Sequence, residues 1–519
     1  MTRTESIVSS GTATSYDVAI VGFGPTGMTL AALLGQAGHR VVVLERYEGL
    51  YSLPRAAAFD DETMRTFQKL GIAEQVLHGA KVQPGYTWVN GSGETLLDIE
   101  YDHPGRSGWP AQYMMYQPHL EETLDVAVAA LPTVDVLRGC TAEHLLEHEE
   151  GVELSAVSSS GTRTEVTARY LVGADGGNSV VRDHISPELD DFGFNENWLV
   201  CDFSLRHDVP SLPTFQQVCN PADPVAIVNI GPGYHRFSFR LESGDERDEV
   251  VRPENVWPRV ADYLTTDDAD LIRVANYTFR SCVALQWRSG RMIIAGDAAH
   301  QMPPFLAQGM VSGIRDARNL AWKLSLVLEG HDASLLDTYQ AERDAHVRFV
   351  IEKAVELGRV QTMRDPVLAS QRDERMIAAR RAHRFPDKLE YPALRGGLID
   401  SSGEIFPQGL VSLEGRTALF DDLAGTGWLL VARNKHVLAA TDDADLAAFE
   451  RLGGRVISFG IDSMVEDVTI SDTGGVYQRW FGSTGVTAAI VRPDSYTYGV
   501  ATDAQELATL TKNLISTLS

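Results

Sequence analysis

The sequence predicts an α/β fold with three parts: an N-terminal domain with a parallel sheet, an antiparallel sheet inserted into that domain, and a C-terminal α/β module. Residues 16–44 contain an apolar run, a glycine turn, a helical pattern and a second apolar run, which together form a βαβ unit. Polar and apolar residues alternate around residues 198–241, as in HRFSFRLE, which is typical of antiparallel strands. From about residue 395 onward, short apolar strands alternate with helical segments, which predicts a separate module.

Each predicted element has a local cause. Residues 16–21 form an apolar strand before the glycine turn, residues 26–37 have helical spacing, and residues 40–44 form the next strand. Apolar residues recur every three or four positions within residues 313–328, so a long helix is predicted there, with Gly330 as its end. We also predict a buried strand over residues 291–295 and a long helix over residues 335–361.

These elements predict a discontinuous domain organisation. The predicted parts are a disordered leader over 1–15, the N-terminal domain over 16–82, 113–195 and 280–394, the inserted sheet over 83–112 and 196–279, and the C-terminal module over 395–519.

Composition excludes several classes of partner. The formal net charge of −26 argues against nucleic acid and anionic membranes, because both attract basic surfaces. The longest apolar stretch, residues 18–34, is interrupted by glycines and a proline, so it is not predicted to span a membrane. No CxxC pair occurs, and no His, Cys and carboxylate cluster has metal-ligand spacing. We expect a cytoplasmic protein without a metal, and with reduced thiols at Cys140, Cys201, Cys219 and Cys282.

The motif GFGPTG within the βαβ unit predicts a dinucleotide site. Gly22 permits the tight turn, Gly24 lets the backbone approach a pyrophosphate, and Gly27 allows close packing of helix and strand. The amides at the helix start then bind the phosphates. Glu45, at the end of the second strand, can accept hydrogen bonds from ribose hydroxyls. A chance glycine turn is the alternative, and this motif does not separate FAD from NAD.

Two further motifs lie far from the first. YLVGADGGNSVVR contains Asp175, and RMIIAGDAAHQMPPFLAQGM contains Asp297. Together the three motifs resemble the flavin site of the FAD-dependent aromatic hydroxylases, whose N-terminal domain is Rossmann-like. The resemblance implies that Asp297 reaches the ribityl chain of FAD and that Asp175 serves FAD and a passing nicotinamide cofactor. A solvated turn at Asp175, or a helix cap at Asp297, is the alternative.

The same resemblance implies the rest of the cofactor site. It places Arg55 outside the flavin and Gln117 at the ribityl chain, although either could be a surface polar residue. Ala307 stands where the family usually has glycine. His300 is either a catalytic base or, as we expect, a structural histidine that holds the loop. Further FAD-binding residues implied are Pro25, Thr26, Arg46, Arg182 and Gly296, and the residues implied to line the flavin ring are Pro303, Gln308, Gly309 and Met310.

The C-terminal module resembles the thioredoxin-like domain of the subgroup that contains 3-(3-hydroxyphenyl)propionate hydroxylase and several polyketide hydroxylases. It has no CxxC and cannot perform dithiol chemistry. We expect a structural role or a subunit contact, such as a homodimer. A basic run before this module is expected to be a solvated helix face rather than a phosphate site; it contains Arg372, Arg375, Arg380, Arg381 and Arg384.

The resemblance implies a single-component monooxygenase that uses FAD, NADH or NADPH, and O₂ to hydroxylate a small phenolic substrate through a flavin C4a-hydroperoxide. A phenol with a carboxylated side chain is the leading expectation, and a polycyclic aromatic polyketide is the alternative. A flavin-dependent dehydrogenase or oxidase, or a flavin-binding module without turnover, is the alternative from a different class. The inserted sheet is expected to cover the substrate, with Gln216, His235 and Arg236 as candidates for contact with its polar end.

Overall fold

The computed structural model describes residues 15–101, 103–242, 247–384, 389–461 and 470–518. The predicted α/β class is confirmed: the chain forms several sheets covered by helices. The leader predicted over residues 1–15 lies outside the described residues, apart from Ser15, which begins the first strand.

The N-terminal domain is built on a largely parallel sheet with the strand order β17-β18-β11-β1-β2-β8. The central strands are apolar and buried over residues 18–21 of β1, 41–44 of β2 and 170–173 of β11. Helix α1 joins β1 to β2, so the predicted βαβ unit is present. The bounds are β1 Ser15–Val21, α1 Pro25–Gln36, β2 Val41–Glu45, β8 Val134–Arg138, β9 Cys140–Glu147, β10 Val152–Ser158, β11 Arg163–Gly173, β17 Arg288–Ser289 and β18 Met292–Ile294.

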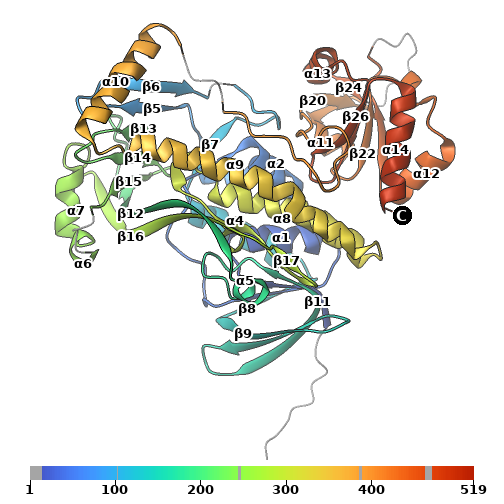
Figure 1. The fold of residues 1–519 in the computed structure, drawn as a ribbon, viewed down its shortest axis with the longest axis horizontal. Coiled ribbons are helices and arrows are strands. Elements are labelled where there is room, and N and C mark those ends of the chain that lie inside the picture. Colours follow the sequence, from blue (N-terminus) through green and yellow to red (C-terminus); the bar gives the residue numbers. More distant parts are fainter. Residues whose placement is uncertain (1–14, 102, 243–246, 385–388, 462–469, 519) are drawn as a thin grey trace, which may run out of the picture.

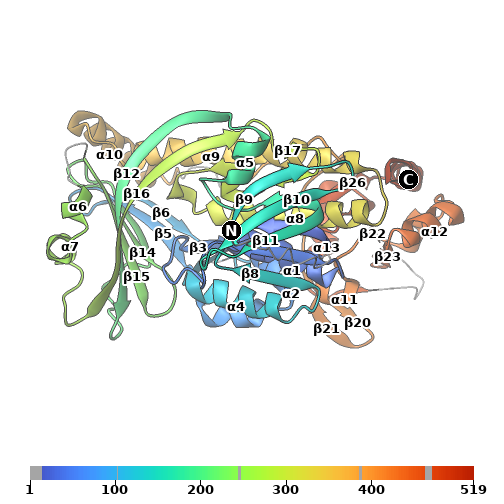
Figure 2. The same cartoon turned by 90° about the horizontal axis from the view of Figure 1, so that it is seen from below.

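The second large sheet has the order β19-β16-β12-β15-β14-β13-β5-β6 and is antiparallel except where β13 meets β5. Strands β12 and β16 are long and pair from Leu189 opposite Ala284 to Leu205 opposite Ala269. Figure 2 shows them as one curved ribbon running from the region of α7 to that of α5. The bounds are β5 Gly85–Val89, β6 Thr95–Glu100, β12 Leu189–Leu205, β13 Phe215–Val218, β14 Val225–Asn229, β15 Tyr234–Arg240, β16 Ala269–Ala284 and β19 His300–Gln301.

The boundaries proposed for the inserted sheet, at residues 195/196 and 279/280, fall inside β12 and β16. Both strands continue without interruption from the N-terminal domain into the inserted sheet. Each of these strands is therefore shared between the N-terminal domain and the inserted sheet.

Two long helices pack against each other in this part of the chain. Helix α8, Gly309–Leu328, begins four residues earlier than residue 313, because Gln308 already caps it after the proline-containing loop. Helix α9, Asp337–Gln361, packs along α8 (Figure 1). The other helices here are α2 Asp61–Leu70, α3 Ala73–His78, α4 Gln117–Ala129, α5 Val180–Ile185, α6 Arg247–Val250, α7 Pro253–Val260 and α10 Pro366–Arg381, and a small sheet joins β3 Ala58–Asp60, β4 Ala80–Val82 and β7 Gln112–Met115.

The C-terminal module has a four-stranded sheet with the order β23-β22-β25-β26. Strands β22 and β23 are parallel, and the other two pairs are antiparallel, which is the arrangement of a thioredoxin-like sheet. Figure 1 shows this module at one end of the molecule and the β12–β16 sheet at the other. The bounds are β20 Leu410–Leu413, β21 Arg416–Leu419, α11 Phe420–Ala424, β22 Leu429–Ala432, α12 Asp443–Arg451, β23 Arg455–Ser458, β24 Ser471–Asp472, α13 Val476–Thr484, β25 Ala488–Val491, β26 Thr497–Ala501 and α14 Ala504–Leu518.

Within the described part of the chain, no helix combines the length and apolarity that crossing a bilayer requires. The same residues contain no group of three His, Cys, Asp or Glu side chains placed to hold a metal ion.

Candidate active site

The glycine turn after β1 is shaped by close backbone contacts. Gly22 has φ +103°, and a Cβ on it would lie 2.3 Å from the carbonyl oxygen of Ala174. A Cβ on Gly27 would lie 2.1 Å from the carbonyl oxygen of Gly22. By contrast, a Cβ on Gly24 would meet only the Arg55 guanidinium, at 3.9 Å. The first and third glycines thus serve packing, while the second leaves room beside a cation. This fits a pyrophosphate of FAD at the turn.

Glu45 and Arg46 end β2 next to this turn. The Glu45 carboxylate accepts hydrogen bonds from the amides of Phe23 at 2.8 Å and Tyr47 at 2.9 Å. These bonds fix an acceptor where a ribose would lie. The exposed Arg46 guanidinium instead lies over the Tyr47 ring, 4.8 Å from its centroid.

Pro25 and Thr26 join the glycine turn to the third motif. Pro25 is buried at the first position of α1, where its missing amide hydrogen costs nothing. A Cβ on Gly296 would lie 2.7 Å from the Thr26 hydroxyl oxygen, and one on Gly313 would lie 2.2 Å from it. The Thr26 side chain thus fills the space between α1, α8 and Gly296.

Asp297 is an exposed carboxylate between the buried residues Gly296 and Ala298. The protein crowded around it raises the pKa of its carboxyl, and the charges of His300 and Arg55 oppose that rise. Asp297 thus presents its carboxylate to solvent within the field of Arg55. Such a group gains from hydrogen bonds to ligand hydroxyls.

A buried ion pair holds the Asp297 loop in place. His300 Nε2 lies 2.6 Å from Asp316, whose carboxylate also accepts the Gly296 amide at 3.0 Å. Burial alone would raise the pKa of Asp316, but His300 and Arg343 lower it to about 2. The structure therefore supports the structural role expected for His300 rather than that of a catalytic base.

Asp175 and Arg182 organise the second motif. Asp175 accepts hydrogen bonds from the Ser179 hydroxyl at 2.5 Å and the Val180 amide at 2.8 Å, so it binds the start of α5, whose N-cap is Ser179. Burial raises the pKa of its carboxyl. Arg182 is buried and donates to the carbonyls of Gly177 and Ala298, which ties the second motif to the third. The structure thus brings all three motifs together.

Gln117 fixes the loop that carries Arg55. Its side-chain oxygen accepts the amides of Arg55 at 2.8 Å and Ala56 at 2.5 Å, and its nitrogen donates to Glu121 at 2.6 Å. The half-exposed Arg55 guanidinium lies 3.6 Å from Glu121. Gln117 is buried, so its observed role is to position Arg55 beside Gly24.

The loop before α8 is held at both ends. Pro303 is buried, and the buried Gln308 accepts a 2.7 Å hydrogen bond from Arg315. Gly309 and Met310 follow, partly buried, as the first residues of α8. Ala307 adopts φ +54°, the left-handed region that disfavours an L side chain. This loop is therefore strained at the position where the family usually has glycine.

A cavity of about 910 Å³ opens beside this loop. Part of its wall is apolar and comes from the inserted sheet and the loop, with Tyr86, Trp88, Leu97, Phe215, Phe305, Leu306 and Ala307. Another part is polar and comes from four different regions of the chain, with Asp60, Asp61, Glu62, Arg315, Tyr391 and Tyr496. Burial, reinforced by the charge of Asp60, raises the pKa of Asp61 to about 7. An apolar cavity with convergent polar groups and a perturbed carboxyl is typical of a substrate site.

The three residues proposed for substrate contact lie elsewhere, which corrects that expectation. Gln216, His235 and Arg236 do not line the cavity. Arg236 is buried, with Nε 2.6 Å from Asp202, and it donates to the carbonyl of Arg55 at 2.6 Å. His235 is buried, and burial lowers its pKa to about 4. Strand phase decides which side chains face the cavity, and the sequence did not determine it.

The basic run that was predicted to be a solvated helix face differs from that prediction at Arg372. Arg372 is 1% exposed and donates to the carbonyls of Val360 and Cys219. The neighbouring Arg375, Arg381 and Arg384 are exposed, in agreement with a solvated face. Arg372 thus joins α10 to the inserted sheet.

Several residues of the cavity were not identified from the sequence. Asp61 and Glu62 follow a short buried strand, and the run DDE there was the one signal that could have indicated them. Arg315 lies six positions beyond Gly309 on α8. Tyr496 comes from the C-terminal module, and no local pattern marks it.

Comparison with known proteins agrees with this geometry. Residues 15–354 match the FAD binding domain family, and residues 403–517 match the HcaD C-terminal domain family. The chain is 65% identical over 506 residues to "Probable NADH-specific resorcinol 4-hydroxylase" of Rhodococcus jostii (strain RHA1), covering 97% of this chain and 96% of that one. It is 32% identical over 525 residues to "3-(3-hydroxy-phenyl)propionate/3-hydroxycinnamic acid hydroxylase" of Mycobacterium sp. (strain JLS), covering 96% and 91%.

The fold also matches solved structures. The complex of aklavinone-11 hydroxylase with FAD and aklavinone superposes with a TM-score of 0.78 at 23% identity, over 96% of this chain and 99% of that one. p-Nitrophenol 4-monooxygenase PnpA from Pseudomonas putida DLL-E4 superposes with a TM-score of 0.65 at 25% identity, over 70% and 94%. The convergent motifs, the matched domains and the 65% identity along nearly the whole chain establish that this protein belongs to the FAD-dependent aromatic hydroxylases.

Proposed function

We propose that this enzyme hydroxylates a neutral dihydroxybenzene of the resorcinol type, with NADH as the electron donor. The observation that carries the proposal is the charge of the cavity. The buried part of the cavity contains the guanidinium of Arg315, which lies 2.5 Å from Asp60 and 2.6 Å from Glu62. One cation is thus matched by two carboxylates, so a substrate carboxylate placed there would meet repulsion.

The cations at the rim are also paired. Arg106 lies 3.1 Å from Glu404, and Lys353 lies 2.7 Å from Glu356. The acidic residues of the wall are Asp60, Asp61, Glu62, Asp98, Glu100, Glu356, Glu390 and Glu404. This surplus favours a neutral diol over the carboxylated phenol that was the leading expectation. The 65% identity to a relative named as an NADH-specific resorcinol hydroxylase supports the same substrate class and NADH rather than NADPH.

The residues of this chain have distinct tasks in such a reaction. Bound FAD supplies hydride acceptance and oxygen activation. The turn at Gly24 and the carboxylate of Glu45 hold the dinucleotide, and Asp297 accepts hydrogen bonds from it. The N-terminus of α8 directs its partial positive charge at the loop of Gly309, which favours negative charge on a ligand there.

The cavity wall excludes water and provides a proton acceptor. Phe305 and Leu306 lie on the loop, opposite the aromatic residues of the inserted sheet, and these apolar side chains limit water near the substrate. Asp61, with its pKa raised to about 7, can accept a phenolic proton near neutral pH.

The test is to follow NADH and NADPH oxidation by the FAD-loaded enzyme with resorcinol and, in parallel, with 3-(3-hydroxyphenyl)propionate. We expect resorcinol to stimulate oxidation of NADH, with oxygen uptake and a product heavier by one oxygen atom in mass spectrometry. Stimulation by the propionate alone would contradict the proposed substrate. Substrate turnover without oxygen would instead indicate a dehydrogenase.

The assembly and location remain proposals. We infer a cytoplasmic enzyme, because NADH is its donor and its four cysteines are free thiols among the described residues. We also propose a homodimer, in which the C-terminal module has a structural role or forms a subunit contact. Light scattering of the eluting enzyme during gel filtration tests it, and a monomer mass would contradict it.

A further inference from the structure

The C-terminal module contributes Glu404, Ile405 and Tyr496 to the wall of the substrate cavity. Tyr496 lines the cavity, and its hydroxyl donates a 2.7 Å hydrogen bond to Glu62. Glu62 accepts Arg315 Nε at 2.6 Å, and Arg315 Nη1 donates to Gln308 at 2.7 Å. All four residues are buried, with between 1% and 9% of their surface exposed. A continuous chain of hydrogen bonds therefore joins the module to the residue that caps α8.

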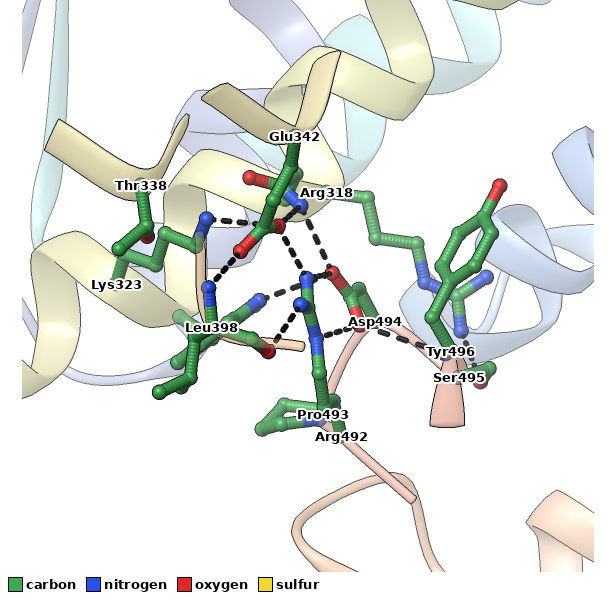
Figure 3. A network of polar contacts seen from close by, with 12 residues as sticks. Arg318, Lys323, Thr338, Glu342, Leu398, Arg492, Pro493, Asp494, Ser495 and Tyr496 are labelled. Atoms are coloured by element: carbon green, nitrogen blue, oxygen red, sulfur yellow. Dashed lines mark hydrogen bonds and ion pairs between the residues drawn. The ribbon is translucent and has the colours of Figure 1, made fainter. Parts of the chain in front are cut away.

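The turn that carries Tyr496 is anchored by buried charges (Figure 3). Arg492 lies 2.7 Å from Glu342 of α9 and 2.6 Å from Asp494. Lys323 of α8 lies 2.9 Å from the same Glu342 carboxylate. Lys323, Glu342, Arg492 and Asp494 are each at most 1% exposed. Buried ion pairs of this kind fix one arrangement, because any displacement leaves an uncompensated charge.

One face of α8 is dedicated to this contact. Arg318 donates to the Ser495 hydroxyl at 2.7 Å, Asn319 donates to Asp494 at 3.1 Å, and the Trp322 indole donates to Asp494 at 3.2 Å. These residues follow Arg315 at helical spacing, so they share a face with it. The face that binds the C-terminal turn is thus continuous with the side chain that lines the cavity.

Helix α2, which carries Glu62, is held by the same module. Arg65 forms a two-pronged ion pair with Asp421, with both contacts at 2.7 Å, and it donates to the carbonyl of Phe406 at 2.6 Å. Glu62 and Arg315 are therefore positioned from one side by α2 and from the other by Tyr496.

We propose that the C-terminal module completes the active site and that Tyr496 is a positioning residue for the loop over residues 303–310. Its hydroxyl orients Glu62, Glu62 orients Arg315, and Arg315 holds Gln308 at the end of the strained loop. The proposal goes beyond the substrate assignment and rests on the proposed function only for its kinetic consequence. The module thus acts on catalysis although it carries no CxxC.

The test compares two conservative variants of the full-length, FAD-loaded enzyme, Tyr496→Phe and Tyr477→Phe. Tyr477 is a matched control, because it is a buried tyrosine of the same module whose hydroxyl accepts the Gly409 amide at 3.1 Å, away from the cavity. Hydrogen exchange of peptides covering residues 303–310 is measured by mass spectrometry, and this readout needs neither substrate nor turnover.

We expect Tyr496→Phe to accelerate exchange of residues 303–310 by about fivefold, the effect of about 1 kcal/mol for one hydrogen bond, and Tyr477→Phe to leave it unchanged. Tyr496→Phe should also raise the KM for resorcinol more than it lowers kcat, and divert NADH oxidation toward hydrogen peroxide. A second variant, Glu62→Gln, keeps an acceptor for Tyr496 but weakens the hold on Arg315, so it should accelerate the same peptides.

Wild-type exchange of residues 303–310 in both Tyr496→Phe and Glu62→Gln would overturn the proposal. Equal acceleration in Tyr477→Phe would also overturn it, because that result would indicate general loosening of the module. If resorcinol does not stimulate the wild-type enzyme, the proposed substrate is wrong, and the exchange result still decides the role of Tyr496.

Discussion

Gly22 approaches Ala174 so closely that a Cβ on Gly22 would lie 2.3 Å from the Ala174 carbonyl oxygen. This contact joins the first and second motifs through backbone alone. We expect Gly22→Ala to destabilise the FAD-free protein by about 3 kcal/mol, because both the contact and the positive φ are incompatible with a side chain. Gly24→Ala has ordinary φ and open space, so it should keep the stability and lose FAD affinity. Thermal denaturation and FAD titration distinguish the two, and equal stability losses would contradict this division of roles.

Asp297 is expected to hold FAD through its carboxylate. Asp297→Ala should weaken FAD binding by about tenfold or more, since a hydrogen bond to a charged group contributes about 1.5–3 kcal/mol. The ratio of flavin to protein absorbance after gel filtration measures the loss. Glu149→Ala, which removes another exposed carboxylate in the turn between β9 and β10, is the control. Undiminished flavin content in Asp297→Ala would refute the assignment.

The strain at Ala307 predicts a stabilising substitution. Ala307→Gly should raise the free energy of unfolding by about 1 kcal/mol, because a left-handed conformation costs an L residue about 1–2 kcal/mol and glycine recovers most of this. Ala341→Gly on the exposed surface of α9 should have the opposite sign, with a loss of about 1 kcal/mol. Denaturant unfolding of both variants checks the pair. A destabilised Ala307→Gly would mean that the left-handed conformation is not strained.

The buried ion network should contribute far more than an exposed pair. Arg492→Met leaves Glu342 and Asp494 without their common cation, and we expect a loss of about 3–5 kcal/mol. Arg206→Met breaks the exposed pair with Asp270, 2.5 Å away, and should change the stability little, because solvent screens such a pair. Denaturant unfolding of the wild type and of each variant measures the loss of unfolding free energy at the two sites. Similar losses at the two sites would show that burial does not govern these pairs.

Asp61 predicts a pH dependence of stability. Its pKa is raised from 3.8 to about 7 in the folded state, so the folded protein binds more protons than the unfolded chain between these values. The Asp61 contribution to stability is therefore full below about pH 4 and is lost as the pH rises through 7. Asp61→Asn removes this loss, and we expect it to gain about 4 kcal/mol over wild type between pH 4 and pH 8, since each pKa unit corresponds to about 1.4 kcal/mol.

Melting temperatures of wild type and Asp61→Asn across this pH range test the prediction. Because other groups titrate equally in both proteins, the difference between the two curves isolates Asp61. Parallel curves would indicate that Asp61 ionises normally in the folded state.

The sequence was sufficient where function depends on local spacing. Gly22 and Gly27 make the close backbone contacts that their positions in the turn predicted, and the α/β class followed from the same periodicities. The sequence was insufficient where side-chain packing determines the role of a residue. Arg236 looked available for a substrate, but Asp202 on a neighbouring strand occupies it. Such pairing depends on strand register, which charge and alternation alone do not fix.

The contact between Tyr496 and Glu62 could not be predicted from the sequence, for a different reason. The two residues are 434 positions apart and lie in different parts of the fold. No sequence pattern beside either residue predicts a partner, and a tyrosine before a strand is common. Only the three-dimensional arrangement of α2, α8 and the C-terminal turn reveals the connection.

The place of residues 492–496 in the chain has a consequence for biosynthesis. A ribosome delivers the whole N-terminal domain, including α8 and α9, before it delivers Arg492 and Asp494. Until then, Lys323 is the remaining cationic partner of the Glu342 carboxylate among the described residues. The nascent enzyme can thus acquire its Rossmann-like framework early, yet it remains catalytically immature until this late segment docks. Premature release of the polypeptide would yield a flavin carrier with a poorly ordered reaction chamber.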